Sequence, residues 1–153
     1  MLQWIDIAGA ATPAELEAAR ALLLAYAEEQ GFKLCFQGFD KELAGLPGDY
    51  AEPAGCLLLA RRDGAPVGVV ALKPLGNGSA ELKRLFVLPA GRGAGLGRRL
   101  AETAIARARA TGYRQVWLET LEGMAAARAL YATLGFRSQG RDTAGIERMA
   151  LAL

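Results

Sequence analysis

The chain has 153 residues, 52% of them hydrophobic, and a formal net charge of +2 at pH 7. This length is typical of one domain that buries most of its apolar surface on folding. The chain has no apolar, uncharged run long enough to span a membrane, and its small charge argues against nucleic acid as a partner.

The chain begins with a predicted strand and a helix. Residues 2–7 are expected to form the strand, because apolar and polar side chains partly alternate there. A helix start follows, since Thr12 can cap it, Pro13 suits its first position and Glu15 completes a capping box. Apolar spacing continues this helix to Gly31, a good terminator.

The next segment is less regular and leads into a set of strands. Apolar residues at three- and four-residue steps predict a short helix within residues 32–46. The phenylalanine-rich stretch 32–50 packs onto the sheet or, alternatively, forms a substrate-side wall. Residues 55–62 and 67–75 are expected to be adjacent strands, joined by a four-residue connection that starts at Asp63-Gly64.

The second half of the chain alternates between strands and helices. The strand at 81–88 leads through a glycine-rich loop into a helix over 96–110. Residues 115–121 then form a strand parallel to the one before the helix. A helix over 124–134 and an antiparallel pair, 136–138 with 146–153, complete one α/β domain over residues 1–153.

The glycine-rich loop predicts a site for an anion. Four glycines alternate with other residues over 91–97, directly before a helix whose first N–H groups and dipole favour negative charge. A nucleotide P-loop is excluded because the chain has no Gly-Lys pair. The dinucleotide pattern G-x-G-x-x-G fails as well, since its last position would fall on Leu96 or Arg98.

The loop instead fits the pattern [Q/R]-x-x-G-x-[G/A], with Arg92, Gly95 and Gly97. It follows the strand E-L-K-R-L-F-V and precedes, at a distance, A-L-Y-A-T-L-G-F. Together these motifs resemble the acetyl-coenzyme A signature of the GNAT N-acetyltransferase superfamily, and the order of elements over essentially the whole chain is similar to its fold. The resemblance implies a mixed sheet of about six to seven strands with four helices, splayed between the strands ending at Val87 and Leu121.

The resemblance also implies that the co-substrate is acetyl-coenzyme A, held mainly by backbone groups. The splayed strands would hold its pantetheine arm and the loop would wrap its pyrophosphate. The residues implied are Leu85, Phe86, Val87, Arg92, Gly93, Ala94, Gly95, Leu96, Gly97 and Arg98. Many members carry Asn where this chain has Met124, so no contact is assigned to that position.

Acetyl transfer to an amine requires a base, stabilisation of an oxyanion and an acid for the leaving thiolate. The resemblance implies Tyr131 as the acid, although it could instead be a core aromatic, and the N–H of Phe86 or Val87 as oxyanion donor. Glu81 matches a catalytic glutamate of some members, and Glu119 is its rival, because a bulge near the splay would change which side chains face the cleft. Either carboxylate could instead form a salt bridge.

The chain has no histidine, and Cys35 and Cys56 lack C-x-x-C spacing, so we expect neither a metal site nor a covalent acetyl-enzyme. We expect the thiols to be buried in a reducing cytoplasm. We also expect no signal peptide, because the stretch beginning at Met1 reads as amphipathic.

We therefore expect a cytoplasmic N-acetyltransferase that moves an acetyl group from acetyl-coenzyme A to a primary amine by direct attack in a ternary complex. Its acceptor would be a small molecule, an amino acid or a protein amine, with no nucleic acid or membrane partner, and a homodimer is left open. The alternatives are a non-catalytic acetyl-coenzyme A sensor or regulatory module and a phosphate-binding nucleotide domain of another fold.

Overall fold

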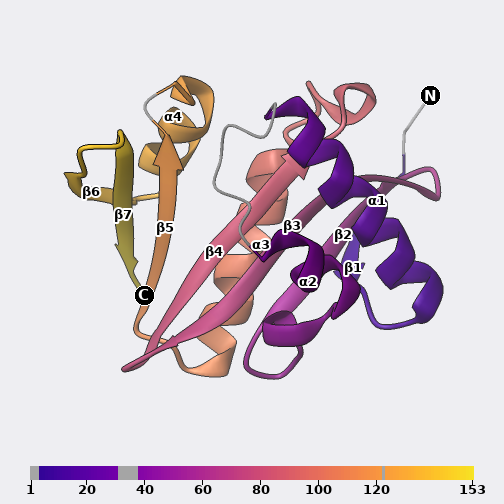
Figure 1. The fold of residues 1–153 in the computed structure, drawn as a ribbon, viewed down its shortest axis with the longest axis horizontal. Coiled ribbons are helices and arrows are strands. Elements are labelled where there is room, and N and C mark those ends of the chain that lie inside the picture. Colours follow the sequence, from indigo (N-terminus) through magenta and orange to yellow (C-terminus); the bar gives the residue numbers. More distant parts are fainter. Residues whose placement is uncertain (1–3, 31–37, 122) are drawn as a thin grey trace.

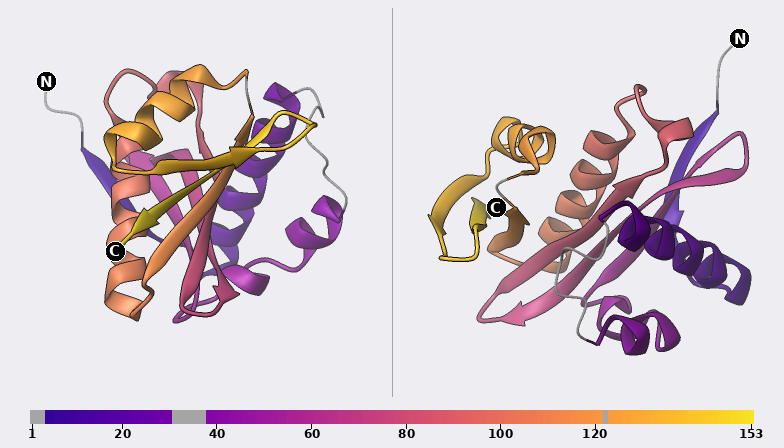
Figure 2. Two further views of the ribbon diagram at one scale, coloured as in Figure 1. Left: turned by 90° about the vertical axis from the view of Figure 1, so that its left-hand side faces the viewer. Right: turned by 45° about the horizontal axis from the view of Figure 1, so that its top comes forward.

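The computed structural model describes residues 4–30, 38–121 and 123–153, which form a seven-stranded mixed sheet with helices on both faces (Figures 1 and 2). The strands are β1 (Ile5–Gly9), β2 (Cys56–Arg62), β3 (Ala65–Gly76), β4 (Ser79–Val87), β5 (Gln115–Leu121), β6 (Arg137–Arg141) and β7 (Ile146–Ala152). The α-helices are α1 (Pro13–Glu29), α2 (Phe39–Ala44), α3 (Leu96–Thr111) and α4 (Ala125–Thr133). The predicted α/β fold and its order of elements are confirmed.

One local signal acts as the sequence predicts, and a second differs in length. The capping box forms, because Glu15 N–H donates to Thr12 Oγ1 at 3.2 Å and Thr12 N–H donates to Glu15 Oε1 at 2.8 Å. The β2–β3 turn contains only Asp63 and Gly64, since Arg62 pairs directly with Ala65. The predicted four-residue connection is therefore wrong: positive φ values of 51° and 87° allow a two-residue turn that matches the strand twist.

Some predicted boundaries fall outside the described residues. The first strand is seen from Ile5 and extends to Gly9, while residues 1–3 of the prediction are not described. Of the predicted helix within 32–46, the structure describes α2 alone, and residues 32–37, which include Phe32, Cys35 and Phe36, are not described. A 3-10 turn over Gly48–Tyr50 follows α2.

The sheet is buried on both faces, and each face has its own core. On the α3 side, apolar residues of the sheet pack with α3 and α4; examples are Leu58, Leu72, Leu82, Leu100 and Leu118. On the α1 side, they pack with α1 and α2; examples are Leu23, Phe39, Leu59, Val69 and Phe86. Cys56 is buried on the α3 side, as expected for this thiol. Figure 2 shows the helices on the two sides.

The sheet opens between β4 and β5, its only parallel neighbours among the described strands. The order is β1-β2-β3-β4-β5-β7-β6, and β4 pairs with β5 only over Ser79–Glu81 with Gln115–Trp117. Beyond these three pairs the strands diverge, leaving a gap that widens towards their carboxyl ends (Figure 1). The predicted splay is therefore confirmed.

Candidate active site

A pocket lies in the gap between β4 and β5. It is lined by residues 81–85 of β4 and residues 119–121 of β5, by Tyr131 of α4 and by Tyr26 of α1. The splay lets side chains from both sides of the sheet reach the same space, because no ladder closes the sheet there. All three residues predicted to be catalytic thus line one pocket.

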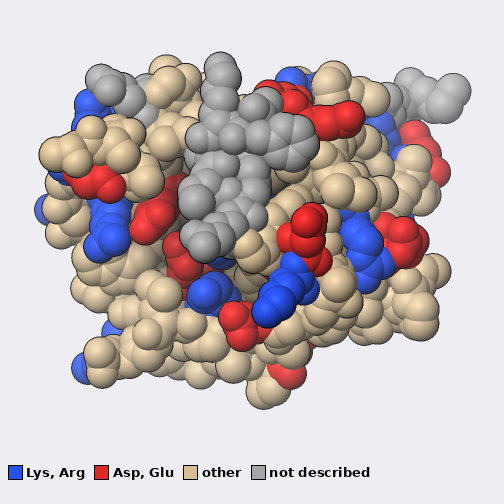
Figure 3. Space-filling model, viewed as in Figure 1, with Lys and Arg blue, Asp and Glu red and all other residues tan. Residues whose placement is uncertain are grey.

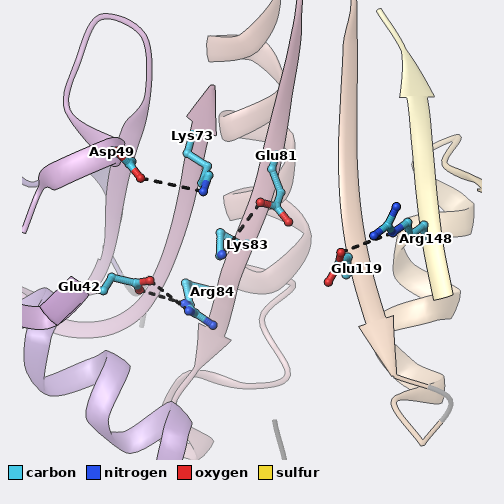
Figure 4. A network of polar contacts seen from close by, with 8 residues as sticks. All are labelled: Glu42, Asp49, Lys73, Glu81, Lys83, Arg84, Glu119 and Arg148. Atoms are coloured by element: carbon cyan, nitrogen blue, oxygen red, sulfur yellow. Dashed lines mark hydrogen bonds and ion pairs between the residues drawn. The ribbon is translucent and has the colours of Figure 1, made fainter. Parts of the chain in front are cut away.

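The two candidate carboxylates lie on the same face of the sheet, across the gap from each other (Figure 4). Leu82 and Leu118 pack into the core on the α3 side, so their neighbours Glu81 and Glu119 face the α1 side. The Glu81 side chain is 17% exposed and lies 3.9 Å from Lys83 Nζ. The Glu119 side chain is 47% exposed and lies 3.5 Å from the Nε of Arg148 on β7.

A bulge in β4 changes the facing of the side chains beside the gap. The β3–β4 register shifts between the pairs Ala71 with Lys83 and Val69 with Phe86, so β4 carries one extra residue there. As a result, Phe86 joins the core on the α1 side, whereas Leu85 packs against that on the α3 side.

Arg84, at the bulge, has a φ of 62°, a conformation that is strained for a residue with a side chain. Its guanidinium makes two hydrogen bonds of 3.0 Å with the Glu42 carboxylate of α2 and lies over the ring of Phe39. Both charged side chains are largely buried. This pair joins α2 to the strand that forms one wall of the pocket.

Two buried tyrosines enter the pocket from opposite sides of the sheet. Tyr131 packs edge-on against Phe136, at 5.8 Å between ring centres, and burial raises its pKa, with a smaller contribution from Tyr26. Tyr26 packs on Phe86, and burial raises its pKa too, although a hydrogen bond from Arg84 and the charge of that group oppose the shift. Both phenols therefore stay protonated at neutral pH. Tyr26 was not predicted as a site residue, because its helical spacing matches that of any core residue.

The first turn of α3 offers backbone donors without a side-chain cap. Its N-cap residue, Gly95, has a φ of 70°, and the first turn contains no acidic residue and no capping side-chain bond. The first helical bond is donated by Arg99 N–H to Gly95 O at 3.1 Å, so the preceding N–H groups are left for another acceptor. This end of α3 meets α4, since Arg98 Nη1 donates to Thr133 Oγ1 at 2.9 Å. Leu130 lies beside Gly97 as well.

The side chain of Arg92 is already bound within the protein. Its Nε donates to Val87 O at 2.9 Å, and its Nη2 lies 2.7 Å from a Glu29 carboxylate oxygen on α1. Arg92 therefore ties the loop to the end of β4 and to α1.

The backbone of Val87 faces the gap. Leu88 N–H donates to Val67 O of β3 at 2.8 Å, and the polar groups of successive strand residues point in opposite directions. The N–H and C=O of Val87 therefore point away from β3, whereas Phe86 pairs with Val69. Of the two predicted oxyanion donors, this geometry favours Val87.

Within residues 4–30, 38–121 and 123–153, neither a cluster of metal ligands nor a membrane-spanning helix is present. That part of the chain contains no group of three His, Cys, Asp or Glu side chains able to hold a metal ion. Its helices are all too short or too polar to cross a membrane.

The chain resembles known acetyltransferases in sequence and in structure. The sequence pattern of the Acetyltransferase (GNAT) family matches residues 22–136. An uncharacterized N-acetyltransferase of Schizosaccharomyces pombe is 37% identical over 136 residues, covering 88% of this chain and 83% of the relative. An IAA acetyltransferase of Azospirillum brasilense is 42% identical over 91 residues, covering 59% of this chain and 60% of that protein.

Among solved structures, the PaiA N-acetyltransferase of Thermoplasma acidophilum in complex with coenzyme A has a TM-score of 0.80 and 18% identity, covering 98% of this chain and 99% of that one. This likeness concerns the fold. The family match and the relatives carry the assignment: the chain belongs to the acetyltransferase (GNAT) family. It is accordingly an acyltransferase, and the predicted family and enzyme class are confirmed.

Proposed function

We propose that this protein transfers the acetyl group of acetyl-coenzyme A to a primary amine by direct attack in a ternary complex. One observation carries the proposal: the uncapped start of α3 meets α4 beside a gap in the sheet that holds two carboxylates and a buried tyrosine. An anion site next to acid–base groups suits a phosphate-bearing acyl donor and an amine acceptor.

The residues present fit acetyl-coenzyme A. The N–H groups over Gly93–Arg98 would bind its pyrophosphate, supported by the dipole of α3, a helix of 16 residues. The backbone of Leu85 and Val87 would hold the pantetheine arm along the open edge of β4. The guanidinium of Arg92 contributes by fixing the loop, because its donors are engaged with Val87 and Glu29.

The side chains of the gap provide the remaining chemistry. Glu81 is our first choice as base, since it is the more buried carboxylate, and Glu119 is the second. The base takes a proton from the acceptor ammonium, and the amine nitrogen then forms a bond with the acetyl carbonyl carbon. Val87 N–H stabilises the negative charge on the carbonyl oxygen while the carbon–sulfur bond breaks. Tyr131 gives its proton to the leaving thiolate. The attacking nitrogen loses its second proton to solvent, from which the Tyr131 phenolate is reprotonated, so the products are a neutral amide and a free thiol.

Two measurements test this function. Calorimetry should detect binding of acetyl-coenzyme A but not of ATP, and a thiol-release assay over a panel of primary amines should detect turnover. Binding without turnover for every amine would favour a non-catalytic sensor module. Binding of ATP alone would contradict the assignment of the loop.

A further inference from the structure

The acceptor side of the pocket contains two lysines that the chemistry above does not use. Lys73 of β3 and Lys83 of β4 lie on the α1 side of the sheet, because Lys73 pairs with Glu81 and Lys83 pairs with Ala71 (Figure 4). We call them the lysine pair. Lys83 lines both the pocket in the gap and a second pocket beside α2, which Lys73 also lines.

Among the described residues, each ammonium group of the lysine pair forms only a long ion pair. Lys83 Nζ is 3.9 Å from Glu81 Oε1, and Lys73 Nζ is 3.9 Å from Asp49 Oδ2, both beyond hydrogen-bond distance. The neighbouring Arg84 pairs with Glu42 at 3.0 Å through two bonds. The lysine pair therefore has capacity for a further anion, whereas Arg84 is already engaged.

Their surroundings favour that anion. The two lysine side chains are only 26% and 28% exposed, so water screens them incompletely. Burial lowers the pKa of Lys83, and the charges of Arg84 and Lys73 lower it further against the opposing effect of Glu81. A bound anion would offset both effects.

The acceptor side of the pocket presents a carboxylate and an ammonium group close to each other. Glu81 and Lys83 are two residues apart on one face of β4, and Lys83 Nζ lies 3.9 Å from Glu81 Oε1. A small molecule with an amine and a carboxylate on one carbon can contact both. Acidic and basic side chains also lie interspersed on the face seen in Figure 3, which suits a zwitterion better than a polycation.

We propose that the acceptor is a free amino acid, whose carboxylate binds Lys83 next to Lys73 while its amine lies towards Glu81. This rests on the proposed acetyl transfer and specifies its substrate class. A protein amino terminus would present an amide in place of the carboxylate, and a polyamine would bring a second cation towards the lysine pair.

The test compares each amino acid with its amide, for example leucine with leucinamide, by thiol release at saturating acetyl-coenzyme A. The two molecules have nearly the same shape and differ in the charge that Lys83 would bind. The amide has the more easily deprotonated amine, so simple amine reactivity would favour it. For the best acceptor, kcat/KM should be at least about tenfold higher for the acid, the effect of one charged hydrogen bond.

Variants then assign the preference to the lysine. Lys83→Met should lower kcat/KM for the amino acid to the level of its amide, mainly through KM, and leave acetyl-coenzyme A affinity unchanged. Lys41→Met, at an exposed lysine of α2 on the rim of the second pocket, should keep the preference.

Equal rates for acids and amides in the unaltered protein would overturn the proposal while acetyl transfer stands, and this comparison needs no variant. A preference that survives in folded Lys83→Met would overturn the role of Lys83. Acetyl-coenzyme A binding without turnover of any amine would instead refute the proposed function, and the amino-acid acceptor with it.

Discussion

The two ends of the gap are built from different parts of the chain. At the α3 end, the groups available to a ligand are backbone groups of one short stretch, namely Val87 N–H and the N–H groups over Gly93–Arg98. At the acceptor end, the groups are side chains drawn from β3, β4 and β5, such as Lys73, Lys83 and Glu119 (Figure 4). A backbone site needs one local conformation, whereas a side-chain site needs several distant segments to be placed correctly.

The largest expected effect is on turnover and comes from changing Tyr131, whose side chain lines the pocket in the gap. Tyr131→Phe removes one hydroxyl and little volume, so folding and acetyl-coenzyme A affinity should change little. Turnover should fall by roughly 10- to 10⁴-fold, because a positioned acid is lost. Steady-state thiol release measures this, and Tyr113→Phe, whose hydroxyl bonds Ala54 O away from the gap, is the matched control.

Full activity of Tyr131→Phe would show that the thiolate leaves without this phenol. If turnover falls in Tyr26→Phe and not in Tyr131→Phe, Tyr26, the other tyrosine of the pocket, is the proton donor to the thiolate.

The second effect tests the backbone end. Gly95→Val places a branched side chain at a φ of 70° in the loop and should weaken acetyl-coenzyme A binding by about 100-fold or more, as expected if two charged hydrogen bonds are lost. Gly112→Val, at the other end of α3, has a φ of 100° and equally open space, so it carries a similar strain of about 1–2 kcal/mol. Calorimetry should show normal affinity for Gly112→Val. If folded Gly95→Val binds acetyl-coenzyme A as tightly as the unaltered protein, the loop does not bind the pyrophosphate.

A smaller effect distinguishes the two carboxylates. Glu81→Gln should reduce kcat/KM by about tenfold or more at low pH, where the acceptor amine most needs its proton removed, and raising the pH should recover part of the rate. Glu119→Gln should change the profile less, because this carboxylate is more exposed and faces Arg148. pH–rate profiles of both variants measure this. The reverse ranking would make Glu119 the base.

The smallest effect concerns the support of the acceptor side. Glu42→Ala leaves Arg84 without its bidentate partner and should destabilise the fold by about 2 kcal/mol, less than the ~3–5 kcal/mol of a fully buried pair because both groups keep some solvent contact. Glu29→Ala, which breaks the exposed pair with Arg92, should cost less than about 1 kcal/mol. Urea denaturation compares the two, and equal losses would mean that burial of the Arg84 pair adds nothing.

The same pair should make stability depend on pH. Burial would raise the pKa of Glu42, but hydrogen bonds from Arg84 and its charge lower it overall. A carboxylate whose pKa is lower in the folded than in the unfolded state stabilises the fold above the unfolded value, and this contribution is lost as pH falls through the folded value. The stability difference between the unaltered protein and Glu42→Ala should therefore shrink below about pH 4, the ordinary range of Glu.

Much of the architecture could be read from the sequence because its signals are local. The capping box at Thr12 and Glu15 acts within one helical turn, and β5 occupies the predicted residues 115–121. The glycine loop was found for the same reason, since its function depends on a backbone conformation that its own residues specify. The splay followed from family resemblance and not from any residue of β4 or β5.

The acceptor side was decided by tertiary structure. That Glu81 and Glu119 face the same side depends on the parallel register of two strands separated by α3. The guanidinium of Arg92 fits the motif, yet it binds Glu29, 63 residues away. Arg84 meets Glu42 across 42 residues, at a bulge that no spacing rule predicts. Contacts of this kind depend on how whole helices and strands are placed relative to one another, and the packing of the two cores sets that placement. The chemical type of a side chain does not reveal which distant residue becomes its partner.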